Sequence, residues 1–238
     1  MKNKLALLSG ILCIGLVIAF IFYTGKDNQK KEGYTTTGFA MGTAVTVSVY
    51  SDQGRQDADA VIDCVSRLER EQISWRIEGS EVYRVNHEYK AGEPYEISYD
   101  LAYAVLQERE VSEAGDDLLA LTIRPLASCW GIEDGKKQVP ETQKIEEACS
   151  AVDDSKVHIV DEQGKELTQV SDLSENGTWY VLFDEAGLSL DFGAMGKGIA
   201  CDRVAENLEE NQVEGACVAV GGSVLCYGTK PDGSGFRI

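Results

Sequence analysis

The segment LDFGAMGKGIACD, residues 190–202, constrains the fold of this chain more than any other. An apolar run ends at Asp191, three glycines and Lys197 follow, and a helix is predicted over 199–210. Glycines let a ligand approach the backbone, and free N–H groups at a helix start attract anions. The segment therefore predicts a strand, a turn and a helix, with one of two roles. The turn either holds an anion beside Lys197, or it is purely structural, with Asp191 capping the helix and Lys197 on the surface.

Spacing excludes the two common nucleotide-binding loops. A Walker A loop reads G-x-x-x-x-G-K-[ST]. Gly196 and Lys197 fit it, but position 191 is aspartate, and Gly198 brings no hydroxyl after the lysine. The dinucleotide fingerprint G-x-G-x-x-G also fails, because the glycines here follow the order G-x-x-G-x-G. If the segment binds a phosphate group, it does so in another way.

The remaining periodicity alternates between strands and helices and predicts an α+β fold. We expect a mixed, largely antiparallel sheet with flanking helices, because most predicted strands are joined by short glycine-containing turns. Strands are predicted within 41–50, 156–160, 178–183, 188–192, 216–220 and 223–228. Helices are predicted over 55–73, 98–113, 140–149 and 199–210, and residues 74–86 are predicted to form a loop with a short helical turn.

The charge balance limits the partners of the protein. With 40 acidic and 22 basic residues the formal net charge is −18. Nucleic acids are bound by clustered Lys and Arg, so we expect no nucleic-acid partner. A small anionic ligand remains compatible, provided that local positive charge or a metal offsets the overall negative field.

The N-terminus predicts a membrane segment. Lys2 and Lys4 precede an uncharged apolar run of about 20 residues, which matches the thickness of a bilayer core. We interpret residues 1–33 as a membrane anchor or signal with its linker, and an uncleaved anchor is favoured. Residues 34–238 are then the functional domain, expected on the extracytoplasmic side of a bacterial cell membrane.

Cysteine and histidine usage argues against a zinc site. The seven cysteines include no C-x-x-C pair, and the chain has only two histidines. Disulfides are permitted in an exported protein, but the spacing does not suggest a disulfide framework. Buried free thiols are the favoured interpretation.

Five motifs in a fixed order carry a family resemblance. They are MGT at 41–43, SWRIEGSEVYRVN at 74–86, LTIRPLASCWGI at 121–132, LDFGAMGKGIACD at 190–202, and VAVGGSVLCYGTKPDGSG at 218–235. Together they resemble the ApbE-like FAD:protein FMN transferases. The resemblance implies an exported or membrane-anchored enzyme. Such an enzyme uses Mg²⁺ to split FAD, attaches FMN to a Ser or Thr hydroxyl of a target protein, and releases AMP. The implied acceptor is a flavoprotein of membrane or extracellular electron transport.

The resemblance also implies site residues. The FAD-binding positions are Met41, Trp75, Leu118, Leu119, Ala120, Asp191 and Lys197. The backbone carbonyl of Ala194 corresponds to a ligand of the metal. Family members often have Phe-Asp within 118–120, so this chain departs from the pattern there, and only backbone contacts are carried over.

The same resemblance places further groups beyond Ile238. The other metal ligands and the segment that activates the acceptor hydroxyl match no motif within this sequence, so the chain is expected to lack part of the fold. Catalytic residues are therefore expected downstream, and the chain alone is expected to be inactive. Two alternatives remain open: a membrane-anchored FAD-binding protein without transferase activity, and an FAD pyrophosphatase.

Overall fold

The computed structural model describes residues 33–116, 118–132, 135, 139–174 and 176–238. The predicted membrane segment lies outside the described residues. Within the described ranges, no helix has both the length and the apolar character needed to cross a bilayer.

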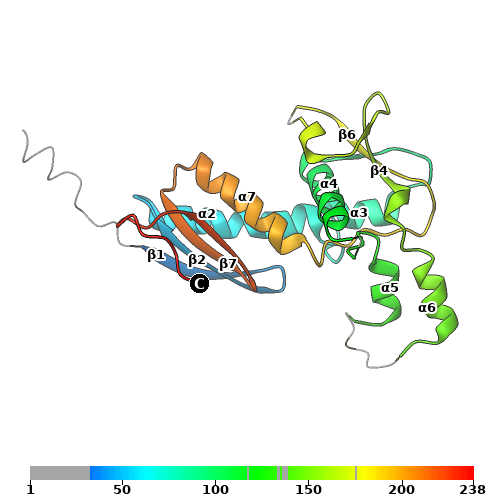
Figure 1. Ribbon diagram of the computed structural model, residues 1–238, viewed down its shortest axis with the longest axis horizontal. Helices are drawn as coiled ribbons and strands as arrows, with labels where there is room; N and C mark the ends of the chain where they lie inside the picture. The colour runs from blue at the N-terminus through cyan, green and yellow to red at the C-terminus, as the bar shows by residue number, and fades with distance from the viewer. Residues whose placement is uncertain (1–32, 117, 133–134, 136–138, 175) are drawn as a thin grey trace, which may run out of the picture.

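Two four-stranded sheets form the framework, at opposite ends of the elongated body in Figure 1. The first has the order β1-β2-β7-β8, with bounds Tyr34–Ala40, Thr43–Tyr50, Gly215–Val220 and Ser223–Gly228. The second has the order β3-β6-β4-β5, with bounds Tyr95–Ile97, Trp179–Phe183, Val157–Asp161 and Glu166–Leu167. All strand pairs among the described residues are antiparallel.

Helices cover both sheets. Near the first sheet lie α2 (Gly54–Arg67) and α7 (Gly196–Glu210), which cross each other in Figure 1. The π-helical turn η1 (Leu68–Ile73) continues α2 towards the second sheet, where α3 (Glu81–Glu88) and α4 (Tyr99–Ala114) pack. The helices α5 (Arg124–Cys129) and α6 (Thr142–Cys149) pair beside them. Two short 3-10 turns, η2 (Asp154–Lys156) and η3 (Val170–Asp172), complete the described elements.

The core of the first sheet follows from strand alternation. Val45, Val47 and Val49 point to one face of β2 and are fully buried. They meet the apolar stripes of α2 and α7, which include Val61 and Val204. Because burial of each such side chain contributes about 1.5–3 kcal/mol, this alternation sets which face of the sheet receives the helices.

The second sheet is closed by α4. Ile159, Val181 and Phe183 are fully buried on its strands. The helix begins as predicted, because the Ser98 hydroxyl accepts a hydrogen bond from the Leu101 N–H (3.2 Å) and satisfies a backbone donor of the first turn. The predicted α+β class with largely antiparallel pairing is thus confirmed, although the strands form two sheets rather than one.

Several element boundaries differ from the prediction. Residues 188–192 form no strand, because side-chain contacts replace a ladder there. Strand β1 was not predicted. Its outward-facing Thr35 and Thr37 hydroxyl groups hydrogen-bond to those of Ser48 and Thr46 on β2. This face of the strand is therefore polar, and the sequence lacks the apolar alternation by which a strand is recognised.

The predicted turn within 74–86 is a full helix, α3, and α5, β3 and β5 were not predicted.

Candidate ligand-binding site

The turn between β1 and β2 is strained at Met41. Met41 and Gly42 have φ values of 52° and 67°, the left-handed pair that a two-residue hairpin turn requires. A non-glycine residue rarely adopts this conformation, and such strain concentrates at functional sites. The Met41 N–H donates to the Glu69 carboxylate at 2.6 Å, so a contact from η1 holds the turn in place. Single π-turns of this kind are themselves frequent at functional sites.

A cavity of about 470 Å³ lies beside this turn. Three segments far apart in sequence form its wall: the hairpin turn, the end of η1 with the residues after it, and the glycine-rich turn before α7. The lining residues are Met41, Gly42, Glu69, Ile73, Ser74, Trp75, Arg76, Phe192, Gly193, Gly196 and Lys197. The structure therefore brings three of the predicted site residues, Met41, Trp75 and Lys197, to one cavity.

Two arginines lie over the ring of Trp75. The guanidinium carbon of Arg124 lies 3.2 Å from the ring centroid, and that of Arg76 lies 4.0 Å away. With Lys197, they give this region local positive charge in an otherwise acidic protein. A flavin or adenine ring would stack on Trp75 only by displacing a guanidinium, which itself is suited to bind phosphate.

Asp191 stabilises the glycine-rich turn and does not cap helix α7. The Asp191 carboxylate accepts from the Gly193 N–H (2.7 Å), and helix α7 begins at Gly196 without a side-chain cap. The interpretation of Asp191 as a helix cap is therefore wrong. Lys197 lies in the first turn of α7 and lines the cavity, where the helix N-terminus also carries partial positive charge.

Asn86 fixes the segment that leads into this turn. Its side-chain amide donates to the Leu190 carbonyl (2.9 Å) and accepts from the Leu190 N–H (2.8 Å). Both backbone groups of a fully buried residue are thereby satisfied without a strand partner. This contact is the physical reason why 188–192 is extended but not part of a sheet.

Replacing Asn86 by alanine is expected to lower the free energy of unfolding by about 2 kcal/mol, because two buried backbone groups lose their partner. Urea denaturation measures this loss. Asn211→Ala is the matched control, because the Asn211 side chain makes an exposed contact at the end of α7. Equal stability of the two variants would contradict the role given to Asn86.

The segment 118–120 lies away from the lining of this cavity. Leu118 is 91% exposed, the Leu119 carbonyl accepts from the Ser112 hydroxyl (2.7 Å), and Ala120 is half-buried. None of the three is among the lining residues. The next residue, Leu121, does contact the glycine-rich turn: its carbonyl accepts a hydrogen bond from the Asp191 N–H at 2.8 Å.

Asp154 fixes the backbone of Leu121 and Thr122, next to the Leu121–Asp191 hydrogen bond. Its carboxylate accepts from the N–H groups of Leu121 (2.7 Å) and Thr122 (2.8 Å) and from the Thr122 hydroxyl (2.6 Å). Leu121 and Thr122 are buried, so these bonds replace the water that the backbone loses on folding. Thr122, the second residue of the 121–132 motif, therefore helps to position this loop through its contacts with Asp154.

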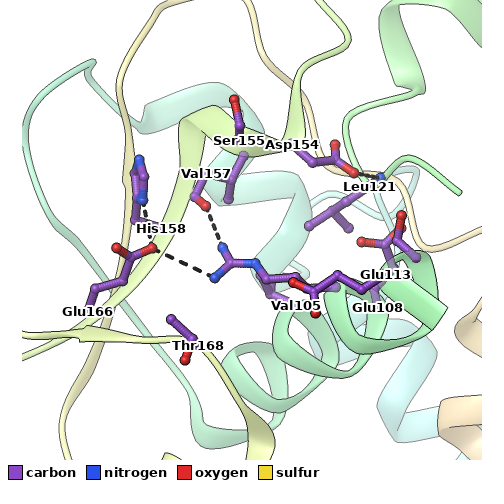
Figure 2. Close-up of a pocket in the computed structure, with 12 residues that line it drawn as sticks. Val105, Glu108, Glu113, Leu121, Asp154, Ser155, Val157, His158, Glu166 and Thr168 are labelled. Carbon is purple, nitrogen blue, oxygen red and sulfur yellow. Dashed lines mark hydrogen bonds and ion pairs between the residues drawn. The ribbon is translucent and has the colours of Figure 1, made fainter. Parts of the chain in front are cut away.

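A second cavity, of about 340 Å³, lies between α4 and the β4–β5 hairpin (Figure 2). Arg109 lines it and donates to the Val157 carbonyl at 2.7 Å. Glu108 is only 3% exposed, and its Oε1 atom has no hydrogen-bond partner among the described residues. Burial, followed by repulsion from Asp154, raises the pKa of Glu108 to about 7. No residue that the sequence predicted for the site lines this cavity.

The described residues would offer few ligands to a magnesium ion. Ala194 is exposed in the glycine-rich turn. The Asp191 carboxylate belongs to the same turn, where it accepts a hydrogen bond from the Gly193 N–H. Among the described residues, no group of three His, Cys, Asp or Glu side chains could hold a metal. Magnesium takes six oxygen ligands, so a carbonyl and one carboxylate fit its chemistry but leave most of its ligands to water or a bound phosphate.

Sequence reasoning missed the residues that connect the site. Glu69, Arg76 and Arg124 contact predicted site residues, and none was singled out. Asn86 ends the 74–86 motif, so its place there was a signal that could have identified it. Asp154 lies more than 30 residues from the groups it binds, and no local pattern marks it.

The fold is α+β, and its cavity is lined by Trp75 and by the basic side chains of Arg76 and Lys197. The chain belongs to the ApbE family, whose sequence model matches residues 41–238.

Curated relatives share low identity with the chain. It is 22% identical over 239 residues to an FAD:protein FMN transferase of Haemophilus influenzae, with 98% of this chain and 64% of the relative covered. It is 28% identical over 196 residues to an FAD:protein FMN transferase of Klebsiella pneumoniae, with 82% of this chain and 56% of the relative covered. The chain thus spans less than two thirds of the length of these relatives.

Solved structures share the fold. The apo form of the flavinyl transferase ApbE of Pseudomonas stutzeri superposes with a TM-score of 0.71 at 23% identity, covering 89% of this chain and 66% of that one. The flavin transferase ApbE of Vibrio cholerae gives a TM-score of 0.72 at 21% identity, covering 87% and 63%.

Proposed function

We propose that this protein transfers FMN from FAD to a Ser or Thr hydroxyl of a flavoprotein and releases AMP. One observation carries the proposal: Met41, Trp75 and Lys197, predicted from separate motifs, line one cavity next to two arginines. The names of the relatives support the same reaction.

The residues present suit a dinucleotide with a charged centre. Lys197 and the start of α7 bring positive charge to the place where a pyrophosphate would lie. In the reaction the acceptor oxygen bonds to the FMN phosphorus, the bond from this phosphorus to the bridging oxygen breaks, and the hydroxyl proton leaves with a base. Negative charge develops on the departing AMP, and positioned cations lower the cost of this step.

Mg²⁺ dependence forms part of the proposal. The Ala194 carbonyl oxygen is the candidate ligand from this chain, and oxygen is the donor that magnesium prefers. When bound, the ion supplies further positive charge at the phosphates.

The test uses the protein expressed with any residues encoded after Ile238, because the chain alone is expected to be inactive. It is incubated with FAD, Mg²⁺ and a flavin-acceptor domain, and the products are identified by mass spectrometry. Covalent FMN on the acceptor together with AMP, both lost when EDTA is added, is the expected result. Free FMN and AMP without labelling would instead indicate an FAD pyrophosphatase. Bound, intact FAD without either product would indicate a flavin-binding protein.

We also propose a membrane-anchored protein whose domain faces the extracytoplasmic side and meets a flavoprotein of electron transport there. The charge-free run that follows Lys4 supports this location. Protease added to intact spheroplasts would degrade the domain if the proposal is correct, and a protected domain would contradict it.

A further inference from the structure

Two cysteines face each other across the β7–β8 hairpin. The register pairs Cys217 directly with Cys226, and Gly221 with Gly222 forms the two-residue turn between the strands. Residues that close a two-residue turn form a hydrogen-bonded pair, and the two pair types then alternate along the ladder. Counting from Val220 and Ser223, the cysteines fall at a non-hydrogen-bonded position.

This position brings the two side chains close together. In a non-hydrogen-bonded pair the Cα atoms are about 4.5 Å apart and the side chains lean towards each other. Disulfides need Cα atoms about 4.4–6.8 Å apart, so the backbone accommodates the bond without a change of register. Among the described cysteines, Cys217 and Cys226 are the two paired directly across neighbouring strands.

Both thiols lie on the face of the sheet opposite the core. Ala216, Val218 and Val220 are fully buried on the other face of β7. Cys217 is half-buried, and Cys226 is exposed on the edge strand β8. A small disulfide in solution can therefore reach Cys226 without opening the core.

The two thiols differ in reactivity. Burial, and then the neighbouring Cys226 thiol, raise the pKa of Cys217. Since the thiolate is the nucleophile, exchange begins at the exposed Cys226. Cys217 then attacks the mixed disulfide, from which it is separated only by the width of the ladder.

We propose that Cys217 and Cys226 are a redox site that forms a reversible intrachain disulfide by exchange with a low-molecular-weight disulfide. In the first step Cys226 bonds to one sulfur of the small disulfide and one small thiol leaves. In the second step Cys217 bonds to Cys226 and the second small thiol leaves. The two protein thiols are oxidised, the small disulfide is reduced to two thiols, and no other oxidant is needed.

The bond lies in the hairpin that supports the ligand-binding turn. The Gly221 N–H donates to the Ala44 carbonyl (3.0 Å), and a side chain at Gly221 would meet Thr43. The disulfide would therefore hold β8 to β7 at the position opposite Ser48, within the hairpin whose turn contacts Thr43 and Ala44. This inference does not depend on the proposed transferase function.

The experiment equilibrates the purified protein with mixtures of oxidised and reduced glutathione, followed by thiol trapping and peptide mass spectrometry. A peptide linked through Cys217 and Cys226 is expected in oxidising mixtures, and dithiothreitol should remove it. The oxidised protein is expected to melt about 5 °C higher, because the cross-link restricts the unfolded chain.

Two variants make the result decisive. Cys226→Ser lies on the surface and should abolish both the linked peptide and the melting shift. Cys149→Ser, another exposed cysteine, should retain both. Glutathione attached to Cys226 without a linked peptide, or free thiols throughout, would overturn the proposal.

Discussion

Lys197→Ala, made in the protein expressed with any residues encoded after Ile238, is expected to reduce FMN transfer by about 100-fold and to weaken FAD binding. Removal of one positioned donor at developing negative charge typically costs a factor of about 10²–10³. Lys197 combines such a charge with the N-terminus of α7, and it lines the same cavity as Met41 and Trp75. Flavin fluorescence measures the affinity, and mass spectrometry of the labelled acceptor measures the rate.

Lys90→Ala is the matched control for this effect. Lys90 is an exposed lysine paired with Glu93 after α3, and it does not line the cavity. Its replacement should leave both measurements unchanged. If Lys197→Ala behaves like the control, Lys197 has no part in the site.

Glu108→Gln is expected to stabilise the protein by about 3 kcal/mol at pH 8. The pKa of Glu108 rises from 4.5 to about 7 on folding, and each unit corresponds to about 1.4 kcal/mol. Between these values the folded state binds more protons than the unfolded state, so stability falls as pH rises from about 4 to 7. Above pH 7 the cost of the buried charge is fully present, and glutamine removes it.

The pH dependence distinguishes this effect from a change in packing. The stability difference between Glu108→Gln and the unchanged protein should shrink towards zero near pH 4, as measured by urea denaturation across the pH range. Glu113→Gln is the control, because Glu113 lines the same cavity but is exposed. A difference that stays constant with pH would show that Glu108 is not charged within the fold at pH 8.

The family resemblance supplied the three predicted residues that line the cavity. Periodicity placed Met41 at the start of a predicted strand and Lys197 just before a predicted helix, but the resemblance assigned both residues to the site. Trp75 was found because it lies in a motif between the two. Their convergence on one cavity depends on η1 and α7 packing together, which no local pattern encodes.

The missed features depend on contacts across long sequence separations. Residues 188–192 have the apolar pattern of a strand, but Asn86, about 100 positions earlier, takes the backbone groups of Leu190. The two arginines over Trp75 come from different parts of the chain, and Arg124 begins a short helix that has no periodicity to reveal it. Strand β1 was missed because its outward-facing side chains are hydroxyl groups that contact those of β2, so it shows little apolar alternation.

The hydrogen bond between the Leu121 carbonyl and the Asp191 N–H joins the neighbourhoods of both cavities. At one end of this bond, Asp154 binds the Leu121 N–H; at the other end, Asp191 belongs to the glycine-rich turn. A substitution scan for loss of ligand affinity should therefore score Asp154 as strongly as a direct contact, although it does not line the ligand-binding cavity. Residues that contact the ligand can be distinguished from residues that only stabilise the loop, such as Asp154, by measuring ligand affinity and the free energy of unfolding on the same variants.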